Sequence, residues 1–132
     1  MGTKTRQRAA MVSKDFIVTL LGRIRFNGVG APTLEAGSEA VESVSRSGVG
    51  GYRIKFKENW PTDFVRLDGN VYSDTGTAVP SVVLMSDYSS LSDVDLRRIE
   101  FVVLDMAGAP FDPTPDETVS FALTVRNSTV ST

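Results

Sequence analysis

Hydrophobic and polar residues alternate along most of the chain after residue 15, in short runs that end at glycine, proline or aspartate. In the clearest run, Tyr52, Ile54 and Phe56 alternate with three cationic residues. Successive side chains of a strand point to opposite sides, so this spacing predicts one buried and one water-facing side. The same pattern predicts seven strands, over residues 16–26, 39–47, 52–57, 63–73, 79–86, 99–104 and 119–126.

Several of these runs also indicate a position in the sheet. Serines and Arg46 in the second run are typical of an edge strand. The glycine after Asp68 in the fourth run predicts a bulge near Asp68 and Gly69. The fifth run contains the continuous apolar segment Val82–Met85, which favours a strand buried on both faces or a subunit contact. The sixth run is apolar on both faces, which predicts a central strand.

No stretch of the sequence sustains the period of an amphipathic helix. Seven short strands separated by turn residues are typical of an all-β domain. We therefore predict an antiparallel β-sandwich of about seven strands, with a small β-barrel as the alternative.

The first fifteen residues differ in composition from the rest of the chain. They contain Lys4, Arg6, Arg8 and Lys14 against the lone acid Asp15, whereas the whole chain has a net charge of −2. This contrast divides the chain into an extended basic N-terminal arm, residues 1–15, and a β-sandwich domain, residues 16–132. The arm is expected either to dock as a short helix on its own domain or to contact a neighbouring subunit, with nucleic acid a less favoured partner.

The amino-acid composition limits the catalytic and metal-binding functions that the chain can have. The sequence has no histidine and no cysteine, so the commonest general base, metal ligand and thiol nucleophile are missing. We expect no enzyme, no catalytic residues, no cofactor and no metal. Loop aspartates could in principle bind calcium, but Asp87, Asp93 and Asp95, and likewise Asp112 and Asp116, lack the ordered spacing of a specific site and are interpreted as solvated charges.

The same reasoning limits the partners. A slightly negative net charge argues against nucleic acid, and no apolar run of about 18 residues indicates a membrane span. Protein surfaces are therefore the expected partners. The candidate contacts are the arm through Arg6 and Arg8, the loop from Val29 to Leu34 and the apolar strand from Val82 to Met85. The candidate partner-binding residues are Lys4, Arg6, Arg8, Val29, Leu34, Val82, Val83 and Met85.

Residues 45–56 read Ser-Arg-Ser-Gly-Val-Gly-Gly-Tyr-Arg-Ile-Lys-Phe, a strand, a Gly-x-Gly turn and a second strand. This segment resembles one found in structural proteins of small tailed-phage virions. The resemblance implies a hairpin of a β-sandwich in a phage particle, located in the virion and bound to capsid or other virion proteins as a homo-oligomer or as lattice-bound copies. A capsid decoration (cement) protein is the favoured role.

Two other roles stay open at this point. The first is a tail, neck or fibre module of the particle. The second is a carbohydrate-binding β-sandwich that uses Trp60, Tyr72 or Tyr88, although an aromatic residue at a strand end is more often a lid on the core.

Overall fold

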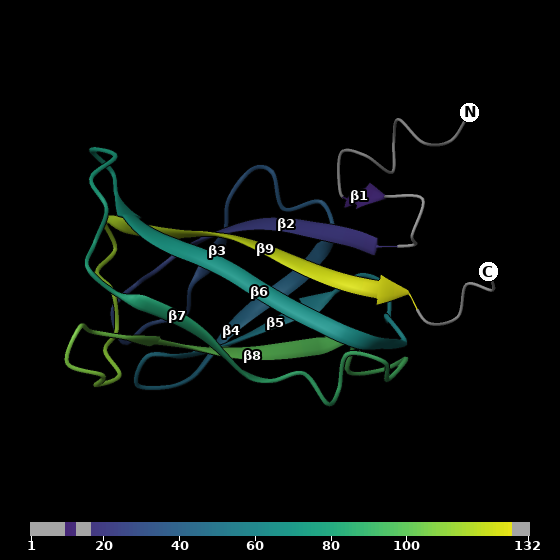
Figure 1. The fold of residues 1–132 in the computed structure, drawn as a ribbon. Coiled ribbons are helices and arrows are strands. Elements are labelled where there is room, and N and C mark those ends of the chain that lie inside the picture. The colour runs from purple at the N-terminus through teal and green to yellow at the C-terminus, as the bar shows by residue number, and fades with distance from the viewer. Residues whose placement is uncertain (1–9, 13–16, 128–132) are drawn as a thin grey trace.

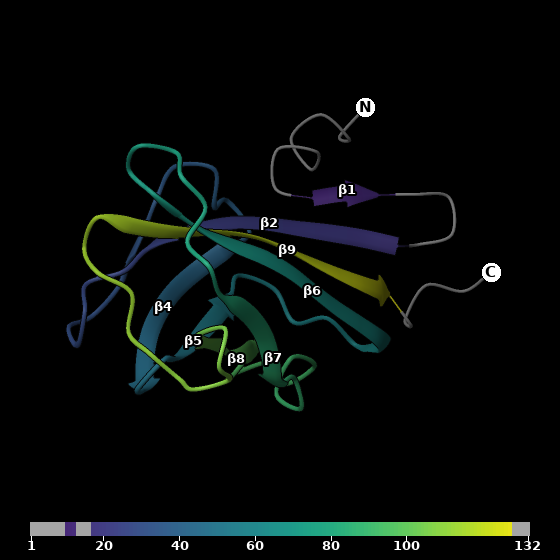
Figure 2. The ribbon, with the colours of Figure 1, turned by 60° about the vertical axis from the view of Figure 1, so that its left-hand side comes forward.

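The computed structural model describes residues 10–12 and 17–127, which form two antiparallel sheets packed face to face as separate layers (Figure 1, Figure 2). No helix occurs in these residues. Sheet A consists of β1 (Ala10–Val12), β2 (Ile17–Arg25), β3 (Thr33–Leu34), β6 (Thr62–Ser73) and β9 (Glu117–Asn127). Sheet B consists of β4 (Val41–Gly48), β5 (Gly51–Phe56), β7 (Val82–Asp87) and β8 (Arg98–Leu104).

The strand order confirms the predicted sandwich. Sheet A runs β1-β2-β9-β6, with β3 also paired to β2, and sheet B runs β4-β5-β8-β7. All seven predicted strands are present, with β4 at an edge and β8 in the interior as expected. The barrel alternative is wrong, because no ladder between named strands joins the two sheets in the described part of the chain.

The core between the sheets is centred on three aromatic rings. Tyr52 of β5 meets Phe26 edge-on at 5.0 Å between ring centroids and stacks on Phe101 of β8 at 5.5 Å. All three side chains are buried. Burying a large apolar side chain stabilises the fold by about 1.5–3 kcal/mol, so these inward-facing positions supply much of the driving force. The alternation seen in the sequence therefore determines which side of each strand enters the core.

A close approach of two strands shapes the middle of sheet A. Phe121 of β9 lies directly opposite Gly22 of β2, and its ring covers the glycine. A Cβ atom at residue 22 would lie 2.3 Å from Cζ of Phe121. Because Gly22 has no side chain, it leaves on the apolar face of β2 the space that the phenylalanine ring occupies.

The other neighbour of Phe121 is also a glycine, Gly69 of β6. A Cβ atom there would lie 3.3 Å from Cγ1 of Val83 on β7, so Gly69 allows the two sheets to come close. Gly69 keeps regular register with β9, and the bulge predicted near Asp68 and Gly69 is wrong. The register of β6 shifts instead between residues 62 and 65.

The chain changes sheets between β6 and β7. The N–H of Ser73 donates to the carbonyl of Thr77 (2.8 Å), and the N–H of Val79 donates to the carbonyl of Val71 (2.8 Å), so the chain first turns back along β6. Pro80 follows, which has no N–H to continue this pairing. The chain then crosses to sheet B, where β7 pairs with β8.

This crossing makes β7 an edge strand, and the expectation that it is buried on both faces is wrong. Val83 and Met85 face inward and pack against the core. Val82 and Leu84 face outward and are 44% and 52% exposed. A continuous apolar run suited a strand covered on both sides, but nothing in the described chain covers the outer side of β7.

Of the N-terminal arm, the structure describes Ala10–Val12. These residues form β1, antiparallel to Val18–Leu20 of β2, so they dock on their own domain as a strand and not as the short helix that was one of the alternatives. The open edge of β2 offers unpaired backbone groups that an extended segment can satisfy. In Figure 1, β1 lies beside β2 in sheet A, whereas β7 and β8 belong to the other layer, sheet B.

Arg25 connects three loops at the end of β2 through hydrogen bonds. Arg25 donates from Nε to Glu35 Oε1 (3.0 Å) and from Nη1 to both Asp74 Oδ1 (3.0 Å) and the carbonyl of Pro115 (2.9 Å). Its partners come from three different connections. The loop over residues 27–38 is therefore anchored to its own domain.

Candidate functional site

The outer face of sheet B is the strongest candidate for a functional surface. Along β8, Arg98, Glu100, Val102 and Leu104 alternate with the buried Ile99, Phe101 and Val103, so the first four face outward. Register places Lys55 beside Arg98, Arg53 beside Glu100, Leu84 beside Val102 and Val82 beside Leu104. The face is therefore divided into two halves along the strands.

We call Val82, Leu84, Val102 and Leu104 the apolar half. Val82 and Leu84 belong to β7, and the other two belong to β8. Because each pair is directly opposite across the β7–β8 ladder, the four side chains form one contiguous patch. Contiguous exposed apolar surface of this kind marks an interaction site more often than isolated exposed residues do.

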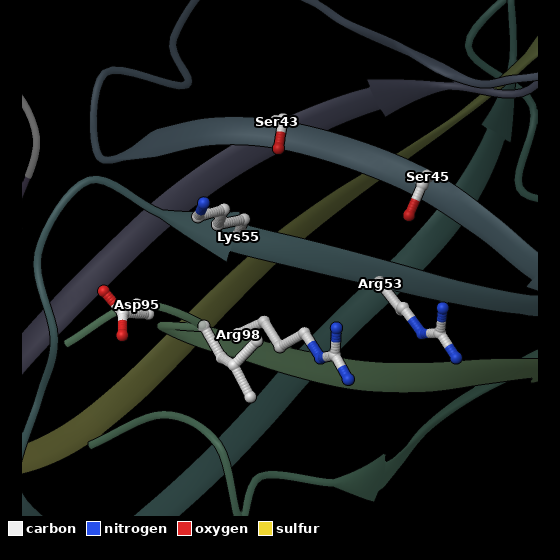
Figure 3. A pocket seen from close by; sticks show the side chains of 7 residues that line it. Ser43, Ser45, Arg53, Lys55, Asp95 and Arg98 are labelled. Carbon is white, nitrogen blue, oxygen red and sulfur yellow. The ribbon is translucent and has the colours of Figure 1, made fainter. Parts of the chain in front are cut away.

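The other half is a shallow groove of about 180 Å³, shown in Figure 3. We call it the polar groove; its lining consists of Ser43, Ser45, Arg53, Lys55, Asp95, Leu96 and Arg98. The serines come from β4 and the first two cations from β5. Asp95 and Leu96 belong to the connection before β8 and form one end of the groove.

Ion pairs hold the cations of the polar groove in place. Arg53 pairs with Glu100 on the adjacent strand, and Nζ of Lys55 lies 3.3 Å from Glu42 Oε2. Each of these pairs is partly exposed and contributes at most about 1 kcal/mol to stability. Arg98 takes part in no ion pair within the described residues. Its nearby charge, after the hydrogen bonds from Ser89, helps to hold the pKa of Asp87 below its usual range.

The charges around the groove are mixed, with cations in slight excess. Its lining holds Arg53, Lys55 and Arg98 against Asp95. Glu100 pairs with Arg53, and Glu42 pairs with both Lys55 and Arg97. Two of the three cations that line the groove are therefore already paired within the chain.

The connection between β7 and β8 is fixed rather than loosely solvated. Leu91 is buried in the core, and its carbonyl accepts the N–H of Trp60 (3.0 Å). Oδ1 of Asp93 accepts the N–H groups of Asp95 (2.7 Å) and Leu96 (2.9 Å), which holds the pKa of Asp93 below its usual range. The connection thus presents its remaining side chains in a defined position.

None of the loop aspartates forms a metal site in the part of the chain that the structure describes. Asp87 and Asp93 satisfy backbone N–H groups of their own loop. Asp112 has a different task that sequence reasoning missed. It links the connection before β9 to the turn between β4 and β5, 62 residues earlier in the chain.

The Asp112 carboxylate accepts four hydrogen bonds. Oδ1 accepts from the N–H of Gly50 (2.9 Å), from Nε of Arg46 (3.0 Å) and from the hydroxyl of Tyr52 (3.2 Å), and Oδ2 accepts from Nη2 of Arg46 (2.8 Å). The Arg46 guanidinium holds the pKa of Asp112 below its usual range, and burial raises the pKa of Tyr52. We interpret this cluster as a structural contact that closes one end of sheet B.

The predicted partner-binding residues fall into three groups. Val29 and Val82 are exposed, as a contact residue must be. Leu34, Val83 and Met85 are partly buried and pack against the core of their own domain. The arm residues Lys4, Arg6 and Arg8 lie outside the described residues.

The aromatic residues considered for sugar binding are dispersed. Trp60 packs against the core, which confirms its interpretation as a lid. Tyr72 is exposed on β6 in sheet A, whereas Tyr88 is exposed just after β7 in sheet B. These positions do not support the carbohydrate-binding hypothesis.

Two further findings complete the description. Within residues 10–12 and 17–127, no helix is long and apolar enough to cross a membrane. The chain matches no protein-family model, no curated protein and no solved structure.

Proposed function

We propose that the chain is a non-enzymatic structural protein of a phage particle, and specifically a capsid decoration protein that binds the shell through its basic arm and its sheet surfaces. The observation that carries the proposal is the apolar half on β7 and β8. Val82 and Leu84 face water on a domain whose core is already filled by other residues. Burial of such a patch by a partner is favourable at about 25 cal/mol per Å² of apolar surface.

The phage setting is supported by the resemblance of residues 45–56. The hairpin of β4 and β5, with Val49 and Gly50 at its turn, has the arrangement that this resemblance implies. The sequence without histidine and cysteine also favours a role that needs no general base or thiol. A compact domain with an added edge strand can clamp many identical sites, and avidity then compensates for weak individual contacts.

Quantitative mass spectrometry of gradient-purified virions of the phage that carries the gene tests the proposal. A decoration protein should be present in many copies per particle. A small, fixed copy number would instead indicate a tail, neck or fibre module. Absence of the protein from purified virions would contradict the proposal altogether.

A binding measurement tests the role of the arm. Virions assembled without the protein should bind added full-length chain, and the variant Lys4→Ala/Arg6→Ala/Arg8→Ala should bind less. The matched control is Lys57→Ala/Arg66→Ala, which removes exposed cations from the domain and should bind normally. Normal binding by the arm variant would assign the contact to the sheet surfaces instead.

A further inference from the structure

Arg98 differs from the other two cations that line the polar groove. Arg53 pairs with Glu100 on the adjacent strand. Lys55 pairs with Glu42. Within the described residues, the guanidinium of Arg98 takes part in no ion pair and no hydrogen bond. A guanidinium carries five N–H donors, and Arg98 is only partly exposed, so these donors are partly removed from water without a protein acceptor.

The carboxylates around the groove do not neutralise Arg98 by direct contact. Glu42 also accepts from Nη2 of Arg97 (3.2 Å), so it is shared between two other cations. Oδ1 of Asp87 accepts a backbone N–H of its own loop (2.7 Å). Asp95 lines the groove but forms no ion pair within the described chain. The groove therefore contains one positive charge that an incoming anion can pair with.

The register of sheet B adds further donors and a repulsion around Arg98. Lys55 lies directly opposite Arg98, and like charges in this position are destabilising. In Figure 3, the side chain of Arg98 extends toward that of Arg53. The hydroxyls of Ser43 and Ser45, opposite the two β5 cations, form no hydrogen bond within the described residues. An anion at this place would meet several donors and offset the repulsion between the cations.

The charge count and the size of the groove indicate which anion fits. A carboxylate has a single charge, which matches the one unpaired cation, and its two oxygens can accept two parallel N–H bonds from a guanidinium. A phosphate dianion or a nucleic-acid backbone brings more negative charge than Arg98 compensates, and Asp95 and Glu100 would repel it. The shallow volume of about 180 Å³ suits a group of side-chain size.

The end of the groove before β8 is fixed in the protein without a ligand. Arg97 has a φ of 47°, its N–H donates to the carbonyl of Asp93 (3.0 Å), and its carbonyl accepts the N–H of Phe56 (2.8 Å). Oδ1 of Asp93 holds the N–H groups of Asp95 and Leu96. This end does not have to be ordered when a ligand binds, which lowers the entropic cost of binding.

We propose that the polar groove binds a carboxylate group, that Arg98 holds it through its guanidinium, and that the carboxylate belongs to an acidic side chain of the protein to which the chain attaches. The last part rests on the proposed function and deepens it by naming the chemistry of the shell surface at this contact. A protein is favoured over a free carboxylate compound because the groove shares its face with the exposed apolar half, and protein interfaces combine apolar and polar regions in this way.

The first test is a titration of the isolated full chain with sodium acetate at an ionic strength held constant with sodium chloride. The backbone amide signals of β4, β5 and β8 in NMR spectra should shift saturably. Arg98→Gln should weaken acetate binding at least about tenfold. Arg66→Gln makes the same change on the exposed face of sheet A and should bind acetate normally. Sulfate, a dianion, should bind less tightly than acetate.

Thermal melting separates a binding role of Arg98 from a structural one. Arg98→Gln should melt at or above the temperature of the wild type, because it removes a positive charge opposite Lys55. A melting temperature several degrees lower would show that Arg98 stabilises the fold and would overturn the assignment.

The second test concerns the source of the carboxylate. Arg98→Glu should bind virions assembled without the protein at least about tenfold more weakly than the wild type, whereas Arg66→Glu should bind them normally. If Arg98→Glu binds virions normally while the wild type binds acetate, the groove takes a free carboxylate compound and the assignment to a protein side chain is overturned.

The carboxylate site itself is overturned by amide signals that do not shift with acetate, or by sulfate binding more tightly than acetate. These results are distinct from failure of the proposed function. That function fails when the protein is absent from virions, whatever the isolated chain does with acetate.

Discussion

Gly22 in sheet A and Gly50 at the β4–β5 turn of sheet B both occupy places where a larger residue would be crowded, but different atoms crowd them. The ring of Phe121 covers Gly22. At Gly50, an added Cβ would lie 2.7 Å from the carbonyl oxygen of Val103 and 2.9 Å from the backbone N of Phe111. Gly50 also has a φ of 66°, a conformation that glycine adopts readily and other residues do not.

The difference shows how each sheet is held. The middle of sheet A is fitted around a side chain, which can rotate or be replaced. The end of sheet B is fitted around backbone atoms that are themselves held by hydrogen bonds, including the one from Val103 N–H to the carbonyl of Gly50 (2.7 Å). Substitutions should therefore be tolerated less well at Gly50 than at Gly22.

The largest effect is expected for Gly50→Ala, which should lower the free energy of unfolding by about 3–4 kcal/mol, the sum of an unfavourable φ and a clash with backbone. Chemical denaturation measures the change. Gly76→Ala is the matched control, because Gly76 has a φ of 83° and open space around it. It should cost about 1 kcal/mol. Equal losses for the two variants would show that close packing at Gly50 is unimportant.

The next effect concerns the carboxylate that binds the Gly50 N–H. Asp112→Asn removes the charge that pairs with Arg46 and should cost about 2 kcal/mol near neutral pH. Asp116→Asn, an exposed neighbour in the same connection, serves as the control and should cost little.

The pH dependence of this effect has a definite sign. The pKa of Asp112 is lowered in the folded protein, so its contribution is fully present above the ordinary aspartate pKa of about 3.9 and is lost as the pH falls through the folded value. The stability difference between wild type and Asp112→Asn should therefore shrink in acid. A difference that stays constant down to the acid transition would contradict the assignment of the ion pair.

In sheet A, Gly22→Ala should cost about 2 kcal/mol, because the ring of Phe121 has to move within a filled core. Denaturation of the variant beside Gly50→Ala compares the two sheets directly. A loss at Gly22 that equals or exceeds the loss at Gly50 would reverse the comparison.

The smallest expected effect is an energetic coupling between substitutions at Gly22 and at Phe121, whose ring covers the glycine. Phe121→Leu removes the part of the side chain that an added Cβ would strike. In a double-mutant cycle, Gly22→Ala should cost about 1 kcal/mol less in the Phe121→Leu background than in the wild type. Strict additivity would mean that the crowding is relieved by the backbone instead.

The sequence predicted the strands well, because alternation is a local property. Tyr52, Ile54 and Phe56 enter the core as their spacing indicates, and the serine-rich β4 lies at an edge. It could not predict which residues of Val82–Met85 face outward. That depends on the crossing at Pro80, which places β7 at the edge of the second sheet.

Local sequence patterns also could not predict the contacts that join the β4–β5 turn of sheet B to the connection before β9. The sequence predicts Asp112 and Asp116 alike to be solvated charges, yet Asp112 binds Gly50 and Arg46 far away in the sequence. The sequence predicts the glycine turn, but no periodicity reveals which distant carboxylate satisfies the N–H of Gly50. The division of the outer face into an apolar half and a polar groove likewise required the strand order and register.

The hairpin formed by β1 and β2 has a mechanical consequence. Because β1 is antiparallel to β2, with Ala10 opposite Leu20 and Val12 opposite Val18, tension applied through the N-terminus opens the pairs one after another, starting at Ala10. Such peeling loads one pair at a time and requires less force than shearing all of them together. A pull on the arm directed across the strands would thus detach β1 before it strained the sandwich, and the domain would stay folded.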